Sequence, residues 1–322
     1  MKLQSIVRSQ RLLITVMTVA TLAVLMSGEG SAGIQGTGRM ALAVSFGRIT
    51  STGGLTVDDV EYNVSQAQVE IDGRAGKANQ LQVGQLVRVE GVLTGPASGA
   101  ANQVTYTSDV VGPISQVDLS AGAFNVLGQT VKVDGTTLFG DGIQPASLAG
   151  LRVGTNVEVS AFVTASGELA ASRVDLQAAG TALQIKGAVE DLDTGAMTFQ
   201  INNLRIDYSQ ASVDGQLANA STATVSADEY PAAGTLHVTR VQVSSGLGGT
   251  AGEKGRLEGL ITSVSSGGAF YVGDQLVVTD ANTHLVLHGH ALTPNLPVRV
   301  QGSFNAVGGL VAKSVVSSPT TP

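Results

Sequence analysis

Three histidines near the C-terminal end of the chain have the spacing most suggestive of chemistry. His284, His288 and His290 are three of the four histidines in the sequence. Their even spacing places them on one face if the segment is extended, and neutral imidazoles grouped in this way can bind zinc, nickel or copper. The same residues also suit solvent-facing turn positions. We therefore expect no metal here, and we keep a metal site at these histidines as the alternative.

The segment Asp193-Thr194-Gly195 matches the catalytic turn of retroviral-type aspartic proteases. Such enzymes pair two of these turns, so that two carboxylates share one proton and activate water. The chain holds no second Asp-Thr-Gly or Asp-Ser-Gly, and aspartate, threonine and glycine are all favoured in tight turns. We interpret the segment as a hairpin turn, and we expect the chain to contain no catalytic residues.

The loops that bind phosphate or calcium in other proteins are incomplete in this sequence. The stretch from Gly73 to Lys77 lacks the Walker spacing, because Ile71 and Ala78 stand where glycine and serine or threonine are required. The calcium-like run from Asp191 to Gly195 lacks the closing glutamate. No Gly-x-Ser-x-Gly nucleophile turn occurs. The sequence therefore predicts no cofactor and favours a protein that is not an enzyme.

The composition argues against nucleic acid as a partner. Proteins that bind single strands use aromatic platforms and a basic groove, whereas this chain has no tryptophan, 7 Phe, 5 Tyr and a formal net charge of −7. An acidic surface repels phosphate backbones. The chain also has no cysteine, so neither disulfides nor thiolate metal sites can stabilise it, and its stability must come from packing.

A fourfold repeat determines which elements must position any functional residue. Each copy opens with a glycine after an apolar or long side chain, continues through short alternating apolar segments, and contains a glycine turn. Alternation over short spans is typical of half-buried antiparallel strands. Self-similarity at a nearly fixed period indicates an array of similar modules. The opening glycines are Gly47, Gly112, Gly187 and Gly259, which lie 65, 75 and 72 residues apart.

The order of elements within each copy predicts the fold class. Five strands with a short helix after the third, such as the segment from Pro145 to Leu151, are the layout of the five-stranded oligonucleotide/oligosaccharide-binding (OB) barrel. We therefore expect an all-β protein of four tandem small OB-like five-stranded β-barrels after an N-terminal signal segment. The residues predicted to lie in barrel cores include Phe124, Phe199 and Phe270. The turn glycines, which are expected to adopt positive φ, are Gly53-Gly54, Gly122, Gly195 and Gly267-Gly268.

The domain boundaries follow from the repeat spacing and the composition. A Gly-rich stretch without apolar periodicity is expected to be a flexible linker, and the patternless C-terminal end is expected to be a disordered tail. The third repeat is the least regular of the four. The predicted segments are a signal peptide at 1–32, β-barrel repeats at 41–110, 111–178, 183–245 and 256–317, a linker at 246–255 and a tail at 318–322.

The first 32 residues have the layout of an export signal. Basic residues precede an uncharged apolar run from Leu12 to Met26, which is shorter than the roughly 20 residues that a membrane-spanning helix needs. Small residues ending at Ala32 then provide a cleavage site. We expect removal after Ala32 and a periplasmic or secreted protein, with membrane contact only if the leader is retained as an anchor.

Several stretches around the first repeat resemble a known bacterial exported family. These stretches are Ser31 to Gly38, Gly47 to Thr50, Val57 to Tyr62 and Val83 to Gly91. They are similar to the family catalogued as domain of unknown function 5666. The likeness extends over residues 33–317 and is clearer in the first, second and fourth copies than in the third. The resemblance implies tandem small β-barrels behind a signal, without assigned catalytic residues.

The residue at position 29 bears on how the protein is attached to the cell. Relatives typically have a lipidated cysteine where Glu29 stands here, so we expect no lipid anchor. The functional expectation is an exported, non-enzymatic binding or structural protein of the cell envelope, with an envelope glycan or protein as its partner. The alternative is an envelope-acting hydrolase or a metal-binding protein with its site in the fourth repeat.

Overall fold

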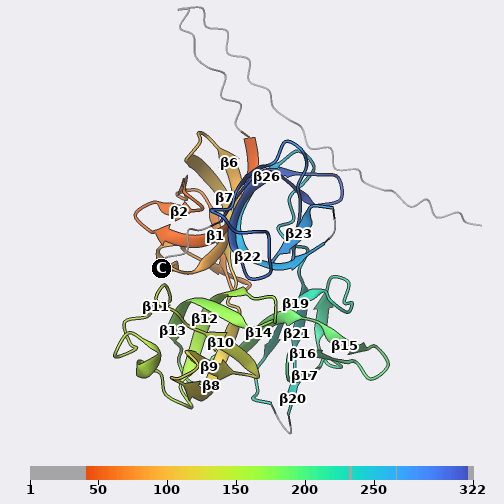
Figure 1. Cartoon of the computed structure of the whole chain (residues 1–322). Coiled ribbons are helices and arrows are strands. Elements are labelled where there is room, and N and C mark those ends of the chain that lie inside the picture. The colour runs from red at the N-terminus through yellow and green to blue at the C-terminus, as the bar shows by residue number, and fades with distance from the viewer. Residues whose placement is uncertain (1–40, 232–233, 266, 318–322) are drawn as a thin grey trace, which may run out of the picture. The chain divides into compact units, whose positions relative to one another are not determined.

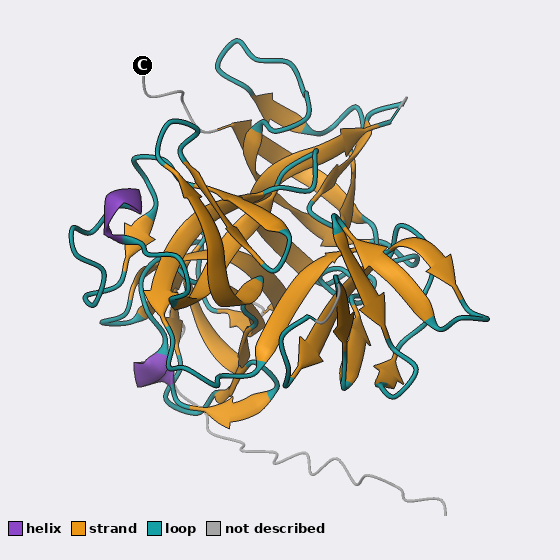
Figure 2. Ribbon diagram, turned by 90° about the horizontal axis from the view of Figure 1, so that it is seen from below, coloured by secondary structure: helices purple, strands orange, loops and turns teal. Residues whose placement is uncertain are grey.

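Strands account for nearly all of the regular structure in this computed structural model, which describes residues 41–231, 234–265 and 267–317 (Figure 1). Figure 2 shows the strands in orange and two short 3-10 helices in purple. The predicted all-β class is confirmed. The predicted signal peptide (1–32) and tail (318–322) lie outside the described residues. Within the described ranges, no helix has the length and apolar character needed to cross a bilayer.

The first repeat is a closed five-stranded barrel. Its elements are β1 (Ala41–Ser51), β2 (Leu55–Val57), β3 (Val60–Asn63), β4 (Gln68–Ile71), β5 (Arg74–Gly76), η1 (Ala78–Gln80), β6 (Leu86–Leu93) and β7 (Ser98–Tyr106). Strand β1 pairs antiparallel with β2, β2 pairs with β3, and β3 runs parallel to β7. Strand β7 pairs with β6, and β6 returns to β1. This circuit is the connectivity expected for an OB-like barrel.

The second and fourth repeats form the same circuit. The second consists of β8 (Val110–Asp118), β9 (Ala123–Val126), β10 (Gln129–Lys132), β11 (Leu138–Phe139), η2 (Leu148–Gly150), β12 (Asn156–Val163) and β13 (Leu169–Leu176). The fourth consists of β22 (Lys254–Val264), β23 (Ala269–Val272), β24 (Gln275–Val278), β25 (His284–Val286), β26 (Pro297–Phe304) and β27 (Leu310–Ser317). In both, the long first strand pairs with the second and fourth barrel strands, and the third runs parallel to the fifth. The helix predicted near Pro145 is the three-residue turn η2.

The third repeat keeps this connectivity but interrupts two strands. Its elements are β14 (Leu183–Ala188), β15 (Glu190–Asp193), β16 (Thr198–Ile201), β17 (Leu204–Asp207), β18 (Ser212–Asp214), β19 (Thr222–Ala227), β20 (Thr235–His237) and β21 (Arg240–Val243). The first barrel strand is broken at Val189, between β14 and β15, and the fifth is broken between β20 and β21. The repeat is therefore divided between a ten-stranded sheet, shared with the second repeat, and the four-stranded sheet β15-β16-β17-β20.

One pair of backbone hydrogen bonds recurs in all four repeats at the bend of the first strand. The Ile49 N–H donates to the Gln85 carbonyl over 2.8 Å, and the Gly84 N–H donates to the Ile49 carbonyl over 2.9 Å. The residues bonded in the same way as Ile49 are Ile114, Val189 and Ile261. Those that take the place of Gly84, each with positive φ, are Gly154, Ala220 and Asn295. The irregular third repeat therefore has the same bend as the other three.

Each repeat has a buried aromatic ring on the hairpin of its second and third barrel strands. Phe124, Phe199 and Phe270 are at most 1% exposed, which confirms their prediction as core residues. Each ring is in register with a β-branched residue on the next strand; these pairs are Phe124–Val131, Phe199–Ile206 and Phe270–Val277. In the first repeat the order is reversed, because Leu55 is in register with Tyr62. The Tyr62 hydroxyl is hydrogen-bonded to Ser45 at 2.6 Å, which satisfies its polar end inside the barrel.

Outer strands join the repeats in two pairs. Strand β1 runs parallel to β22 and joins the first and fourth repeats into a 13-stranded sheet. Strand β8 runs antiparallel to β14 and joins the second repeat to the third. The second and third repeats share one continuous hydrophobic core, whereas the first and fourth have separate cores.

A buried aspartate lies at the junction of the first and fourth repeats. The side chain of Asp58 is 1% exposed, and its carboxylate accepts a hydrogen bond from Arg256 Nε over 2.9 Å. Arg299 Nε lies 3.8 Å from the other carboxylate oxygen, which has no hydrogen-bond partner among the described residues. Burial raises the pKa of Asp58 to about 6, because the loss of hydration outweighs the attraction of Arg256 and Arg299.

The segment expected to be a flexible linker is held by contacts with two repeats. Leu247 is 4% exposed. Its N–H donates to Gln275 Oε1 over 3.0 Å, and its carbonyl accepts from Arg88 Nε over 2.7 Å. Strand β22 begins at Lys254, inside the predicted linker. These contacts could not be predicted from the sequence, because a single buried leucine leaves no periodic signal.

The turn glycines fall into two groups. Positive φ is found, as predicted, at Gly122, Gly267 and Gly268, but not at Gly53, Gly54 or Gly195. In the third repeat Met197 adopts positive φ instead, at 54°. The prediction was wrong for the first repeat because its turn between β1 and β2 has no residue with positive φ, as a type I turn allows. It was wrong for the third repeat because Met197, and not the glycine, adopts the left-handed conformation.

Candidate binding site

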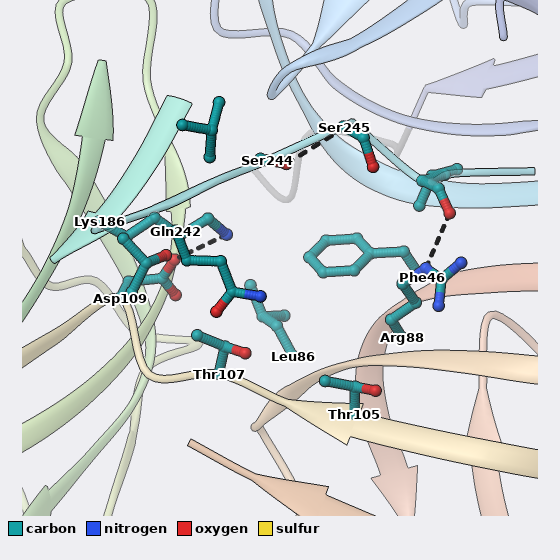
Figure 3. A pocket seen from close by; sticks show the side chains of 14 residues that line it. Phe46, Leu86, Arg88, Thr105, Thr107, Asp109, Lys186, Gln242, Ser244 and Ser245 are labelled. Atoms are coloured by element: carbon teal, nitrogen blue, oxygen red, sulfur yellow. Dashed lines mark hydrogen bonds and ion pairs between the residues drawn. The ribbon is translucent and has the colours of Figure 1, made fainter. Parts of the chain in front are cut away.

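A hollow of about 260 Å³ lies where the first and third repeats meet the segment 244–247 (Figure 3). Its walls come from β1, β6 and β7 of the first repeat and from β14, β19 and β21 of the third. The connection between β7 and β8 completes the lining. The hollow therefore depends on two repeats that are not consecutive in the sequence.

The apolar part of the hollow consists of Phe46, Leu86, Val243 and Leu247. Phe46 directly precedes the opening glycine of β1 and is in register with Arg88 on β6. Residues two apart on a strand project to the same side, so Leu86 and Arg88 face the hollow together with Phe46. Figure 3 shows the Phe46 ring extending into the space between the two repeats.

An ion pair joins the two repeats beside the hollow. Asp109, between β7 and β8, lies 3.3 Å from the Nζ of Lys186 on β14, with side-chain exposures of 4% and 24%. The Asp109 carboxylate also accepts the Ala161 N–H over 2.8 Å. Burial raises the pKa of Asp109, and the neighbouring Asp109 carboxylate raises the pKa of Lys186. The Lys186 ammonium and the Asp109 carboxylate thus face each other at ion-pair distance, and each is engaged by the other.

Arg88 fixes the segment 244–247 against the first repeat. Its Nε donates to the Leu247 carbonyl, and its guanidinium is also paired with Glu90. Ser244 donates its hydroxyl to Asp274 over 2.5 Å. The wall of the hollow formed by this segment is thus held from both the first and the fourth repeats.

Four polar side chains in the lining have no hydrogen-bond partner within the described residues. They are the amide of Gln242 on β21 and the hydroxyls of Thr107, Thr224 and Ser245. Figure 3 shows Gln242 and Thr107 projecting toward the space beside Phe46. Polar groups in a concave site are satisfied by water or by a ligand, so this side of the hollow can bind a polar molecule.

A second hollow, of about 320 Å³, lies between the first and second repeats. The Tyr106 hydroxyl donates to Glu158 over 2.5 Å, and Gln177 donates to the same carboxylate. Burial raises the pKa of Glu158. Because its central groups are bonded to one another, this second hollow offers fewer free partners to a ligand than the first.

The structure does not gather the three histidines into a metal centre. His284 lies on β25, and His288 and His290 follow it; all three are exposed. In residues 41–231, 234–265 and 267–317, no three histidine, aspartate or glutamate side chains are placed to hold a metal ion together. The sequence favoured solvent-facing turn positions for these histidines. His288 has a positive φ of 49°, which is typical of a turn.

The protease-like segment forms the turn between β15 and β16, as interpreted from the sequence. The Asp193 carboxylate accepts the N–H groups of Gly195 and Ala196, each over 2.9 Å. This aspartate therefore stabilises its own turn.

Closed five-stranded barrels in three repeats, and a third repeat of the same connectivity divided between two sheets, make this an all-β protein of OB-like repeats. The family model described as "Domain of unknown function (DUF5666)" matches residues 46–104, 111–175 and 258–316. Since these matches cover more than half of the chain, the protein belongs to this family. The matches coincide with the first, second and fourth repeats. No curated protein matches the chain.

The residues of the hollow were not singled out from the sequence. Lys186 stands directly before the opening glycine of its repeat, where the other copies have Phe46, Val111 and Glu258. A comparison of this position across the copies would have shown that Phe46 and Lys186 differ in type. It could not have shown that the two residues line the same hollow, because that depends on how the first repeat packs against the third.

Proposed function

We propose that this protein is an exported, non-enzymatic binding protein of the cell envelope, and that the hollow between its first and third repeats holds the ligand. The proposal rests on one observation: four polar side chains without a hydrogen-bond partner among the described residues line the same hollow as an aromatic ring. Ligand sites typically combine an apolar wall with a few polar groups that fix the orientation of the ligand.

The charges around the hollow support binding rather than catalysis. Asp109 and Lys186 are paired with each other, and Arg88 is paired with Glu90. A general acid or base must exchange a proton with the substrate, whereas each of these groups is engaged by a partner in the protein. The family description names no activity, and it therefore leaves the binding role as the simplest one that the site supports.

Isothermal titration calorimetry on the exported form tests this role. The probes are soluble oligosaccharides and short peptides, and we expect a member of one class to bind. Gln242→Leu removes an unpaired amide from the hollow and is expected to weaken binding at least five-fold. Gln66→Leu, in an exposed turn of the first repeat, is the matched control. The proposal is wrong if neither class binds, or if Gln242→Leu binds as tightly as the parent.

Export is a separate part of the proposal and has its own measurement. Its support is the leader at 1–32 and the similarity of the chain to an exported family. Mass spectrometry of the protein recovered from the periplasm or the medium is expected to show an N-terminus at Gly33. Recovery of a chain beginning at Met1 in the membrane fraction would contradict removal of the leader.

A further inference from the structure

The side chains of the hollow fit one class of ligand better than others. We propose that the hollow binds a neutral saccharide, with the face of one sugar ring against Phe46 and its hydroxyl groups bonded to the surrounding side chains. This inference rests on the proposed function of the same hollow and names the ligand class.

The apolar surface of the hollow has the form that a sugar ring can use. A sugar ring has a face of C–H groups and an edge of hydroxyl groups. Phe46 offers a flat, partly exposed ring, and the same lining includes Val243 and the largely buried Leu86 and Leu247. Burial of the C–H face against this surface removes apolar area from water on both molecules, while the hydroxyl edge remains free for hydrogen bonds.

The unpaired polar groups match hydroxyl groups in their hydrogen-bonding capacity. The Gln242 amide has both donors and an acceptor, and the hydroxyls of Thr107, Thr224 and Ser245 each donate and accept. A saccharide hydroxyl also donates and accepts. A carboxylate or phosphate only accepts, and it would leave the acceptor sites of these four side chains unused.

Charge also favours a neutral ligand. Lys186 and Arg88 are the two cations of the lining, and each already has a carboxylate partner. An anion would have to compete with Asp109 and Glu90 for these cations and would be repelled by both. The ligand therefore gains more from hydrogen bonds to neutral groups than from an ion pair.

The sheet pairing around the hollow disfavours an extended peptide. Peptides often bind by adding a strand to a free sheet edge. Each of the six strands that line the hollow has a neighbour on both sides. The volume of about 260 Å³ lies just below the range of about 300–1,000 Å³ found for small-molecule sites, which suits one or two sugar rings.

Calorimetric titration with defined probes tests the ligand class. The probes are chitotetraose, cellotetraose and maltotetraose as neutral saccharides, trigalacturonate as an acidic one, and tetra-alanine as a peptide. We expect at least one neutral saccharide to bind. Phe46→Ala is expected to weaken its binding at least ten-fold and Gln242→Leu at least five-fold. Tyr271→Ala removes an aromatic ring that is 37% exposed on β23, and it is expected to leave binding unchanged.

Two readouts keep the test informative if one variant is damaged. Phe46 also packs against the core of the fourth repeat, so its variant is checked by circular dichroism and thermal melting. Gln242 is exposed, and its variant is expected to fold like the parent.

A neutral saccharide bound equally by both folded variants and the parent would overturn the site. Binding of only trigalacturonate or tetra-alanine, weakened by Gln242→Leu, would overturn the saccharide but not the binding function. No binding by any probe would overturn both.

Discussion

The two halves of the molecule use the same barrel in different ways. The first and fourth repeats have separate cores, are both matched by the family model, and are joined by parallel pairing of β1 with β22. The second and third repeats share one core, and only the second is matched. The third repeat nevertheless has the same strand order and the same hydrogen bonds at its bend. Barrel connectivity therefore tolerates changes that remove the family's sequence signature.

The two halves also differ in the junctions that their repeats make. One junction is closed, and the other opens on a hollow. Between the first and fourth repeats, Asp58 is enclosed by Arg256 and Arg299. Where the third repeat meets the first and second, Asp109 is paired with Lys186, whose side chain is 24% exposed beside the hollow. The repeat that departs most from the family pattern thus supplies the lysine, Gln242 and Thr224 of the candidate site.

The largest expected effect concerns the ion pair of the third repeat. Lys186→Met leaves the Asp109 carboxylate buried without its cation, and it is expected to lower the free energy of unfolding by about 3 kcal/mol. Urea unfolding at pH 7 measures the loss. The double variant Lys186→Met/Asp109→Asn removes the buried charge and is expected to recover at least half of it. If the double variant is no more stable than the single one, the pair does not have this role.

The junction of the first and fourth repeats is expected to respond to pH. The pKa of Asp58 is raised to about 6 from its ordinary value of 3.8, so the folded protein binds this proton more tightly than the unfolded chain. Stability contributed by this group is full below pH 4 and falls by up to about 3 kcal/mol as the pH rises to 6 and above.

Urea unfolding from pH 4 to pH 7 tests this response. The parent is expected to lose stability relative to Asp58→Asn over this range, because the variant has no titrating group at that position. Asp59→Asn, whose side chain is 70% exposed, is the control and is expected to follow the parent. A constant difference between the parent and Asp58→Asn at every pH would contradict the prediction.

The next prediction compares the register shifts between the last two strands of the fourth and second repeats. A Cβ at Gly302 would overlap the carbonyl oxygen of Val311, where β26 and β27 shift register. The corresponding position at the register shift of the second repeat is Ala161. Gly302→Ala is expected to lower the free energy of unfolding by about 2 kcal/mol, because the backbone must move to make room for the added methyl group. Ala161→Gly, measured by the same unfolding experiment, is expected to cost less than half as much, and equal costs would contradict the argument.

The smallest effect concerns the bend common to all four repeats. Ala220 has a φ of 65°, where the first and second repeats have Gly84 and Gly154. Ala220→Gly is expected to stabilise the protein by about 0.5–1 kcal/mol, because it relieves the left-handed strain of a side chain. Gly154→Ala is the reverse change, at a φ of 85° with no atom within 4 Å of the added Cβ. It is expected to destabilise by a similar amount, and changes of the same sign in both variants would contradict this interpretation.

The barrels could be predicted from the sequence because their signals are local. Alternation of apolar residues defines the strands, and the repeated glycines mark the bends. Phe124, Phe199 and Phe270 were placed correctly because each follows the glycine turn of its repeat within four residues. The reversal in the first repeat, with Tyr62 as its core ring, was not predicted, since either member of a cross-strand pair can be the larger one.

The candidate site could not be predicted from the sequence because it depends on packing between repeats. Thr107, Lys186, Gln242 and Ser245 are ordinary polar residues in their own segments. No local pattern encodes the parallel pairing of β1 with β22 or the burial of Leu247. The three histidines could be singled out because their spacing is a local pattern. In the structure all three are exposed.

The pairing of β1 with β22 has a consequence for how this architecture can evolve. In open solenoids each module contacts only its neighbours, so modules can be gained or lost at the ends. Here the opening strand of the first barrel is hydrogen-bonded to that of the last. Inserting a fifth barrel into the row would require those two strands to separate. The first and last barrels are therefore not free ends, and a change in the number of copies would have to preserve or replace this contact.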